Sequence, residues 1–187
     1  MKTTIALSLL GSLLISAASF ADTVNLAGNT AGAPTFTRPT ETGARSFFAV
    51  PFIAYQFNVA TSGAFTFTLN AVDPSSYDTF LHLFANAFNP ADVSDPALNF
   101  FAANDDASGS TTNSGLTNLT LFAGTTYFLV VDGFSGSDAG AFTASISGPG
   151  AINVVPEPST IALLCTAGVT LATVMRRRSR QARACDS

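Results

Sequence analysis

The segment Phe65-Thr66-Phe67-Thr68-Leu69-Asn70 alternates strictly between apolar and polar residues. Successive side chains of a β-strand point to opposite faces, so this period of two predicts a strand with one buried and one solvated face. Upstream of it, before the turn signal Thr61-Ser62-Gly63, the residues Tyr55 to Val59 alternate in the same way. The two segments therefore predict two consecutive strands.

Further strands are predicted downstream, each bounded by turn residues such as Asp73-Pro74 and Ala123-Gly124. They are Thr79–Ala85, Leu98–Ala103, Leu116–Phe122, Thr126–Val131 and Ala141–Ser147. Thr79–Ala85 and Thr126–Val131 are apolar on both faces, which is typical of central strands. Gly148-Pro149-Gly150 is expected to end the domain. Seven or eight strands with turns about every 8–12 residues predict an all-β domain over residues 46–150, a small antiparallel β-sandwich with jelly-roll-like topology.

The residues upstream of the sandwich predict export and a short lead-in. Residues 1–21 read as a secretory signal helix, with Lys2 at the start, an apolar stretch at Ile5–Ile15, and small residues around Ala21 for the signal peptidase. Residues 22–45 are rich in Gly, Pro and Thr, and they are expected to be loosely ordered, with one short strand around Val24–Leu26.

The composition limits the partners and the sources of stability. Charged residues make up 11% of the chain, against about 25% in average soluble domains. Between Asp22 and Val155 there are ten acidic and two basic residues, a net charge of −8, and this argues against nucleic-acid binding. Cys165 and Cys185 lie outside that span, so no disulfide is expected to stabilise the domain, and its 17 phenylalanines must supply the core.

The C-terminal region predicts a single transmembrane helix. Ser159–Met175 is a weakly apolar segment of 17 residues, and a helix of that length spans roughly 25 Å, close to the lower limit for a bilayer core of about 30 Å. A basic tail, residues 176–187, follows and carries Arg176, Arg177, Arg178 and Arg180 beside the membrane. By the positive-inside rule these arginines stay cytoplasmic and the β domain lies outside.

Residues 151–187 as a whole resemble the PEP-CTERM sorting signal of Gram-negative bacteria. The resemblance is carried by Pro156-Glu157-Pro158, the short apolar segment and the arginine cluster, in that order. It implies export, recognition by an exosortase in the inner membrane and cleavage near the tripeptide. The membrane anchor would then be transient, and the product would end at the cell surface or outside the cell.

A second resemblance covers residues 46–148. The segments Tyr77-Asp78-Thr79-Phe80-Leu81, Asn104-Asp105-Asp106, Leu121–Val131 and Gly140-Ala141-Phe142-Thr143 are similar to the bacterial pre-peptidase C-terminal (PPC) domain. This resemblance implies a small β-sandwich appended to secreted proteins. Such domains are non-catalytic, and some bind polymers or calcium.

Acidic loop residues are the best candidates for ligand chemistry. Asp78, Asn104, Asp105 and Asp106 offer hard oxygen ligands for Ca²⁺, and Asp132 and Asp138 could add to this site or form another. The spacing is not that of an EF-hand loop. The alternative is that these residues serve as turn formers, because Asp and Asn accept backbone N–H groups and tolerate left-handed geometry. Apart from this possible Ca²⁺, no cofactor is indicated.

Three functions remain open. The first is a structural or matrix protein of the cell surface, associated with exopolysaccharide. The second is a carbohydrate- or polymer-binding module, for which Tyr77 and Tyr127 are candidate exposed aromatics. The third is an enzyme, which is disfavoured because His82 is the only histidine and no nucleophile, zinc-ligand or phosphate-loop motif accompanies it. His82 is expected to be structural or solvent-facing.

Overall fold

The computed structural model describes residues 21–91 and 98–155. This part of the chain is all-β, as predicted, with eleven strands and no helix. The strands are β1 Ala21–Asn29, β2 Thr35–Pro39, β3 Arg45–Pro51, β4 Ile53–Val59, β5 Gly63–Asp73, β6 Thr79–Ala85, β7 Phe100–Asn104, β8 Ser114–Leu121, β9 Thr126–Gly133, β10 Ala141–Pro149 and β11 Ile152–Val155. Within the same ranges no helix is long and apolar enough to cross a membrane.

The predicted terminal segments are not covered by this description. The signal peptide up to residue 20, the tripeptide Pro156-Glu157-Pro158, the segment 159–175 and the arginines of the tail all lie outside the described residues. The predictions made for them stay predictions.

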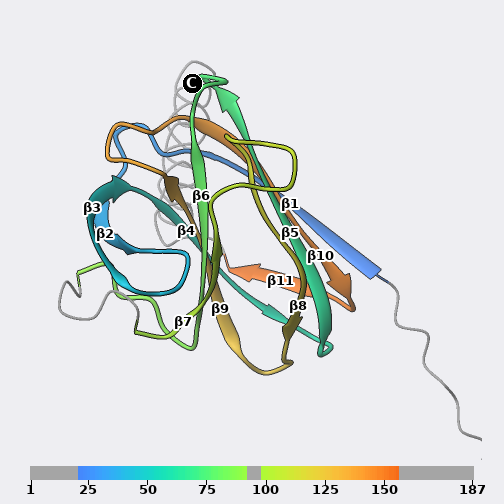
Figure 1. The fold of residues 1–187 in the computed structure, drawn as a ribbon. Helices are drawn as coiled ribbons and strands as arrows, with labels where there is room; N and C mark the ends of the chain where they lie inside the picture. The colour runs from blue at the N-terminus through green and yellow to red at the C-terminus, as the bar shows by residue number, and fades with distance from the viewer. Residues whose placement is uncertain (1–20, 92–97, 156–187) are drawn as a thin grey trace, which may run out of the picture.

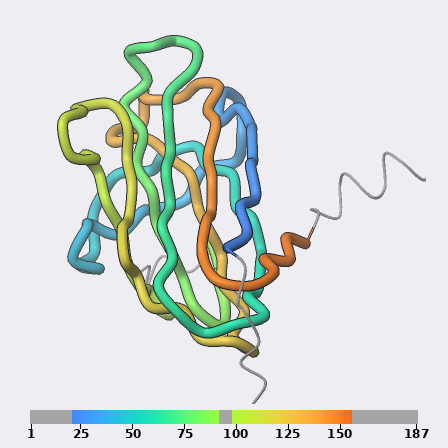
Figure 2. Tube along the Cα trace, turned by 90° about the vertical axis from the view of Figure 1, so that its right-hand side faces the viewer, coloured from blue at the N-terminus to red at the C-terminus, as the bar shows by residue number. Residues whose placement is uncertain are grey.

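Two antiparallel sheets pack face to face in a sandwich-like arrangement (Figure 1). The first sheet has four strands in the order β1-β10-β5-β8, and the second has five in the order β11-β4-β9-β6-β7. Figure 2 views the first sheet from outside, with β10 (orange) between β1 (blue) and β5 (green). β9 and β6 lie inside the second sheet, which confirms that the two segments apolar on both faces are central strands.

The main core fills the space between these sheets, and its residues come from both. β5 contributes its alternate residues Phe65, Phe67 and Leu69, all at most 1% exposed. Facing them are residues such as Leu81 of β6 and Leu129 of β9. Each fully buried side chain of this size contributes about 1.5–3 kcal/mol of transfer free energy, so the alternation that predicts the strands also supplies the stability.

A third layer, the β2–β3 hairpin, covers the outer face of the five-stranded sheet (Figure 1). It closes a second apolar cluster, in which Phe36 of β2 and Val50 of β3 pack with Phe84 of β6 and Val130 of β9. The outward side chains of the central strands are buried here, because the hairpin replaces solvent on that face.

Two expectations about the ends of the domain are wrong. The segment 22–45 is not a loosely ordered lead-in: the short strand expected around Val24–Leu26 is part of β1, which pairs with β10 along its full length, and β2 of the hairpin follows. The domain also does not end at Gly150, because β11 follows and pairs with β4. The backbone N–H of Ile152 donates to the carboxylate of Asp22 at 3.2 Å, so the first and last strands lie side by side.

Candidate functional site

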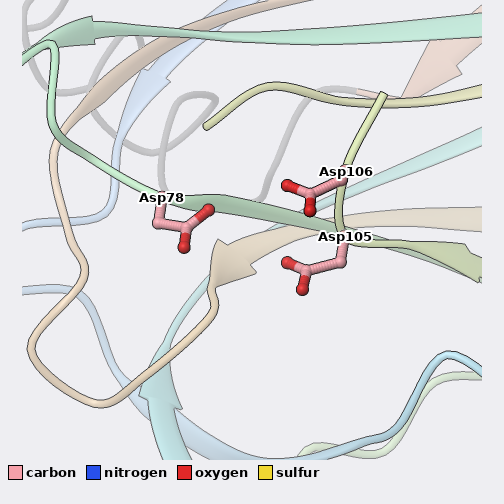
Figure 3. A group of neighbouring side chains, drawn as sticks. All are labelled: Asp78, Asp105 and Asp106. Carbon is pink, nitrogen blue, oxygen red and sulfur yellow. The ribbon is translucent and has the colours of Figure 1, made fainter. Parts of the chain in front are cut away.

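Three of the four predicted ligand residues come together at one end of the five-stranded sheet. Asp78 immediately precedes β6, and Asp105 and Asp106 immediately follow β7. β6 and β7 are antiparallel partners, with Leu81 opposite Asn104, so the start of one strand meets the end of the other. One carboxylate oxygen from each aspartate lies within 4.8 Å of the other two, and the carboxylates point toward a common space (Figure 3).

The fourth predicted residue, Asn104, braces the loop instead. Its side-chain oxygen accepts the Gly115 N–H at 2.9 Å, and its amide donates to the Asp106 carbonyl at 3.2 Å. A residue that the sequence analysis missed lies beside the loop: a Glu41 carboxylate oxygen accepts the Asp105 N–H at 2.8 Å. No local pattern could have identified Glu41, because it lies 64 residues away in sequence and reaches the loop only through the turn of the hairpin.

The electrostatics of this acidic cluster are unfavourable for its carboxylates. Burial, followed by the neighbouring charges of Asp78 and Asp106, raises the pKa of Asp105 to about 6. The pKa of Asp78 is also raised, first by burial and then by Asp138 and Asp106. One oxygen of Asp78 and one of Asp105 are buried without a hydrogen-bond partner. A bound cation would offset the repulsion among these carboxylates with its opposite charge, and it would give the two unpartnered oxygens a ligand bond.

The two further acidic candidates do not join this cluster. Asp138 accepts the Ser135 N–H at 2.9 Å and the Ser135 hydroxyl at 2.6 Å, an arrangement typical of a turn-forming aspartate. Asp132 is fully buried and pairs with His82. The converging group is therefore Asp78, Asp105 and Asp106, with Glu41 beside it.

His82 lies in a buried polar network beneath the hairpin and is 0% exposed, so it is not solvent-facing. Its Nδ1 lies 2.8 Å from the Asp132 carboxylate and its Nε2 lies 3.0 Å from the Pro39 carbonyl. A carbonyl only accepts, so Nε2 carries a proton, and a second proton is shared between Nδ1 and Asp132. Both ring nitrogens are thus engaged, and the histidine links a central strand of the sheet to the hairpin.

Arg38, on β2, completes this network and is only 4% exposed. Its guanidinium carbon lies 4.2 Å from the centre of the Phe80 ring, and its NH groups donate to the carbonyls of Pro39 at 3.2 Å and Phe134 at 2.7 Å. Burial lowers the pKa of Arg38, and the nearby Asp132 is the strongest opposing influence. The positive charge is therefore held inside the fold, where it balances buried acid.

The exposed aromatics are not the ones expected. Tyr77 and Tyr127, the candidate sugar-contacting residues, are 1% and 0% exposed and belong to the core, so that prediction is wrong. Tyr77 lies in the loop before β6, where its hydroxyl donates to the Asp132 carbonyl at 2.8 Å, and Tyr127 on β9 faces the main core. Phe47, at 94%, and the half-exposed Phe48 and Phe134 lie on β3 and in the loop after β9.

No family model matches the chain, and a comparison with curated proteins finds no match.

Proposed function

We propose that this chain is an exported, non-catalytic protein of the cell surface or extracellular matrix, sorted and processed by an exosortase through its C-terminal signal and associated with exopolysaccharide. We further assign the sandwich to the jelly-roll type. The strand orders β1-β10-β5-β8 and β4-β9-β6-β7 support that assignment, since each sheet alternates strands from distant parts of the chain.

One observation supports the proposal that the domain is released by cleavage at both ends. Within the described residues, the strands nearest to the two predicted cleavage sites are β1 and β11. Both are paired in sheets, and the Ile152 N–H bond to the Asp22 carboxylate ties them together. Cleavage after Ala21 and near the tripeptide would remove only the Ala21–Pro149 pair and leave the other pairings intact. The non-catalytic assignment is supported by His82, whose two ring nitrogens are both engaged in buried hydrogen bonds.

The mass of the mature protein tests this proposal. In a host with an exosortase, we expect a mature chain that starts at Asp22 and lacks the segment after the tripeptide. The triple variant P156A/E157A/P158A should keep its C-terminus and stay in the membrane fraction. Asn153→Ala, an exposed position on β11, is the matched control and should be processed normally. An intact C-terminus in the wild-type protein at steady state contradicts the proposal.

A second proposed activity is Ca²⁺ binding by the acidic cluster. It is supported by the convergence of Asp78, Asp105 and Asp106 and by the two buried, unpartnered oxygens. Ca²⁺ takes six to eight oxygen ligands, so water and nearby oxygens would complete the shell. Because the ion would bind the folded state and not the unfolded state, it would raise the free energy of unfolding as its concentration rises.

Thermal denaturation with and without calcium tests this activity. We expect millimolar Ca²⁺ to raise the melting temperature of the wild-type protein, and to leave that of Asp105→Asn nearly unchanged. The matched control is Asp22→Asn, because Asp22 lies on β1 in the other sheet and an asparagine oxygen there can still accept the Ile152 N–H. An equal response of the wild-type protein and Asp105→Asn would show that the acidic cluster is not the site.

A further inference from the structure

The outer face of the four-stranded sheet is polar but uncharged. On β5 the inward residues are Phe65, Phe67 and Leu69, so the alternate residues Thr66, Thr68 and Asn70 point outward. The same alternation on β1 and β10 puts threonine, serine, asparagine and alanine on the outer face. In a domain with a net charge of −8, the middle of this face is without charge. Its chemistry is that of hydroxyls and amides.

A groove of about 460 Å³ lies on this face. At this place β10 lies between β1 and β5, as the backbone trace in Figure 2 shows. Its polar lining is Asn25, Thr68, Asn70, Thr143 and Ser145. The register places Ser145 of β10 between Asn25 and Thr68, and Thr143 of β10 beside Asn70. Short hydroxyl side chains therefore form the floor along β10, and the longer asparagine side chains rise from the strands on either side.

The groove offers hydrogen bonds in both directions. Each amide provides a carbonyl acceptor and two donors, and each hydroxyl can donate and accept. The Thr68 and Ser145 hydroxyls, 2.7 Å apart, hold each other in place and keep further capacity to bond. A single hydrogen bond contributes only about 0.5–1.5 kcal/mol net. A ligand that suits this groove must repeat its hydroxyl groups along an extended chain.

We propose that this groove binds a chain of neutral polysaccharide, an inference that rests on the exopolysaccharide association proposed above. An anionic polymer would find no cation here: of the two basic residues in the described ranges, Arg38 is buried beneath the hairpin and Arg45 begins β3 of the hairpin, on the opposite side of the sandwich. A protein partner would need the large apolar anchors that form interface centres. None lines the groove: the exposed aromatics Phe47, Phe48 and Phe134 belong to β3 and to the loop after β9, and Phe122 lies in the turn after β8.

Affinity electrophoresis of the full-length protein tests the site. Native gels would contain a neutral polymer (hydroxyethyl cellulose, dextran or galactomannan) or the anionic polymer alginate. We expect a neutral polymer to retard the wild-type protein, and the double variant N25A/N70A to weaken that binding about tenfold, since two hydrogen bonds are lost. The matched control is N58A/N153A, which removes two exposed asparagines from the other sheet and should bind like wild type. Equal melting temperatures would show that both variants fold.

The outcomes separate the site from the function. Retardation that N25A/N70A leaves unchanged overturns the groove as the binding site but keeps the polysaccharide association. Stronger retardation by alginate than by every neutral polymer overturns the neutral class of ligand. A protein that no polymer retards contradicts the association itself, and the site with it.

Discussion

The two outer faces of the sandwich carry opposite chemistry although both occupy the same kind of strand position. On the four-stranded sheet, the outward residues of β5 and β10 are Thr68, Asn70 and Thr143, and they line an open groove. On the five-stranded sheet, the outward residues of β6 and β9 are His82, Phe84 and Val130, and the hairpin buries them completely. The hairpin therefore buries the apolar residues of one face, whereas the other face is polar and has no cover among the described residues.

The largest expected effect comes from breaking the buried network on the covered face. His82→Ala leaves the Asp132 carboxylate buried without its partner and removes one of the two donors to the Pro39 carbonyl, which keeps only Arg38. Removal of one member of a buried ionic pair costs about 3–5 kcal/mol, and we expect that loss in the free energy of unfolding measured with urea. Asn25→Ala, on the open face, should cost less than about 0.5 kcal/mol. A loss below about 1 kcal/mol for His82→Ala would contradict a structural role for the pair.

The next effect concerns the attachment of the hairpin. Phe36 is 5% exposed and its ring packs edge-on against Phe52, Phe88 and His82. Phe36→Ala should cost about 3 kcal/mol, since a large buried aromatic is lost, and should speed proteolytic cleavage of the hairpin. Phe47→Ala is the matched control in the same hairpin, because Phe47 is 94% exposed and should contribute almost nothing to stability. Comparable losses for both variants would mean that the hairpin does not act as a cover.

A reciprocal pair of substitutions compares the two faces directly. Val130→Thr puts a hydroxyl into the fully buried cluster beneath the hairpin, and we expect a loss of about 1–2 kcal/mol. Thr143→Val makes the opposite change at an exposed outward position on β10 and should alter stability by less than about 0.5 kcal/mol. Urea denaturation of the two variants checks this. Equal effects would show that the hairpin leaves its face solvated.

The strands that could be predicted are those whose alternation or apolar character is visible in a short stretch of sequence. Alternation and the apolar segments identified β4 to β10, with β7 two residues later than expected at its start. The two segments that are apolar on both faces, β6 and β9, are the ones whose outer residues the hairpin covers. The covering hairpin itself was missed, because residues 22–45 carry the Gly, Pro and Thr content of a loop. β1 was predicted only as a short strand around Val24–Leu26, since its partner β10 lies more than a hundred residues downstream.

The residues of the acidic cluster could be predicted from the sequence, but their convergence could not. Asp105 and Asp106 stand in one loop, and Asp78 stands at a strand start, so their residue types were visible in the sequence. Their convergence required the pairing of β6 with β7, which brings the two loops together. The engagement of Asp132 by His82 across 50 residues had no sequence signal, and neither did the burial of Tyr77 and Tyr127.

The smallest expected effect is a difference in pH dependence between the two faces. The pKa of Asp105 is raised to about 6, mainly by burial, so the folded state holds its proton more tightly than the unfolded state does, where an aspartate titrates near 3.9. The folded state therefore binds more protons between about pH 4 and 6, and its stability falls as the pH rises through that window. Because Asp105 is partly exposed, solvent screens the effect, and we expect a shift of only a few degrees in melting temperature.

Asp105→Asn should flatten this part of the pH profile of the melting temperature, measured without calcium. Thr68→Ala, on the face that carries no ionisable group at its centre, should leave the profile unchanged. A profile that Asp105→Asn does not alter would assign the titration to other carboxylates of the domain.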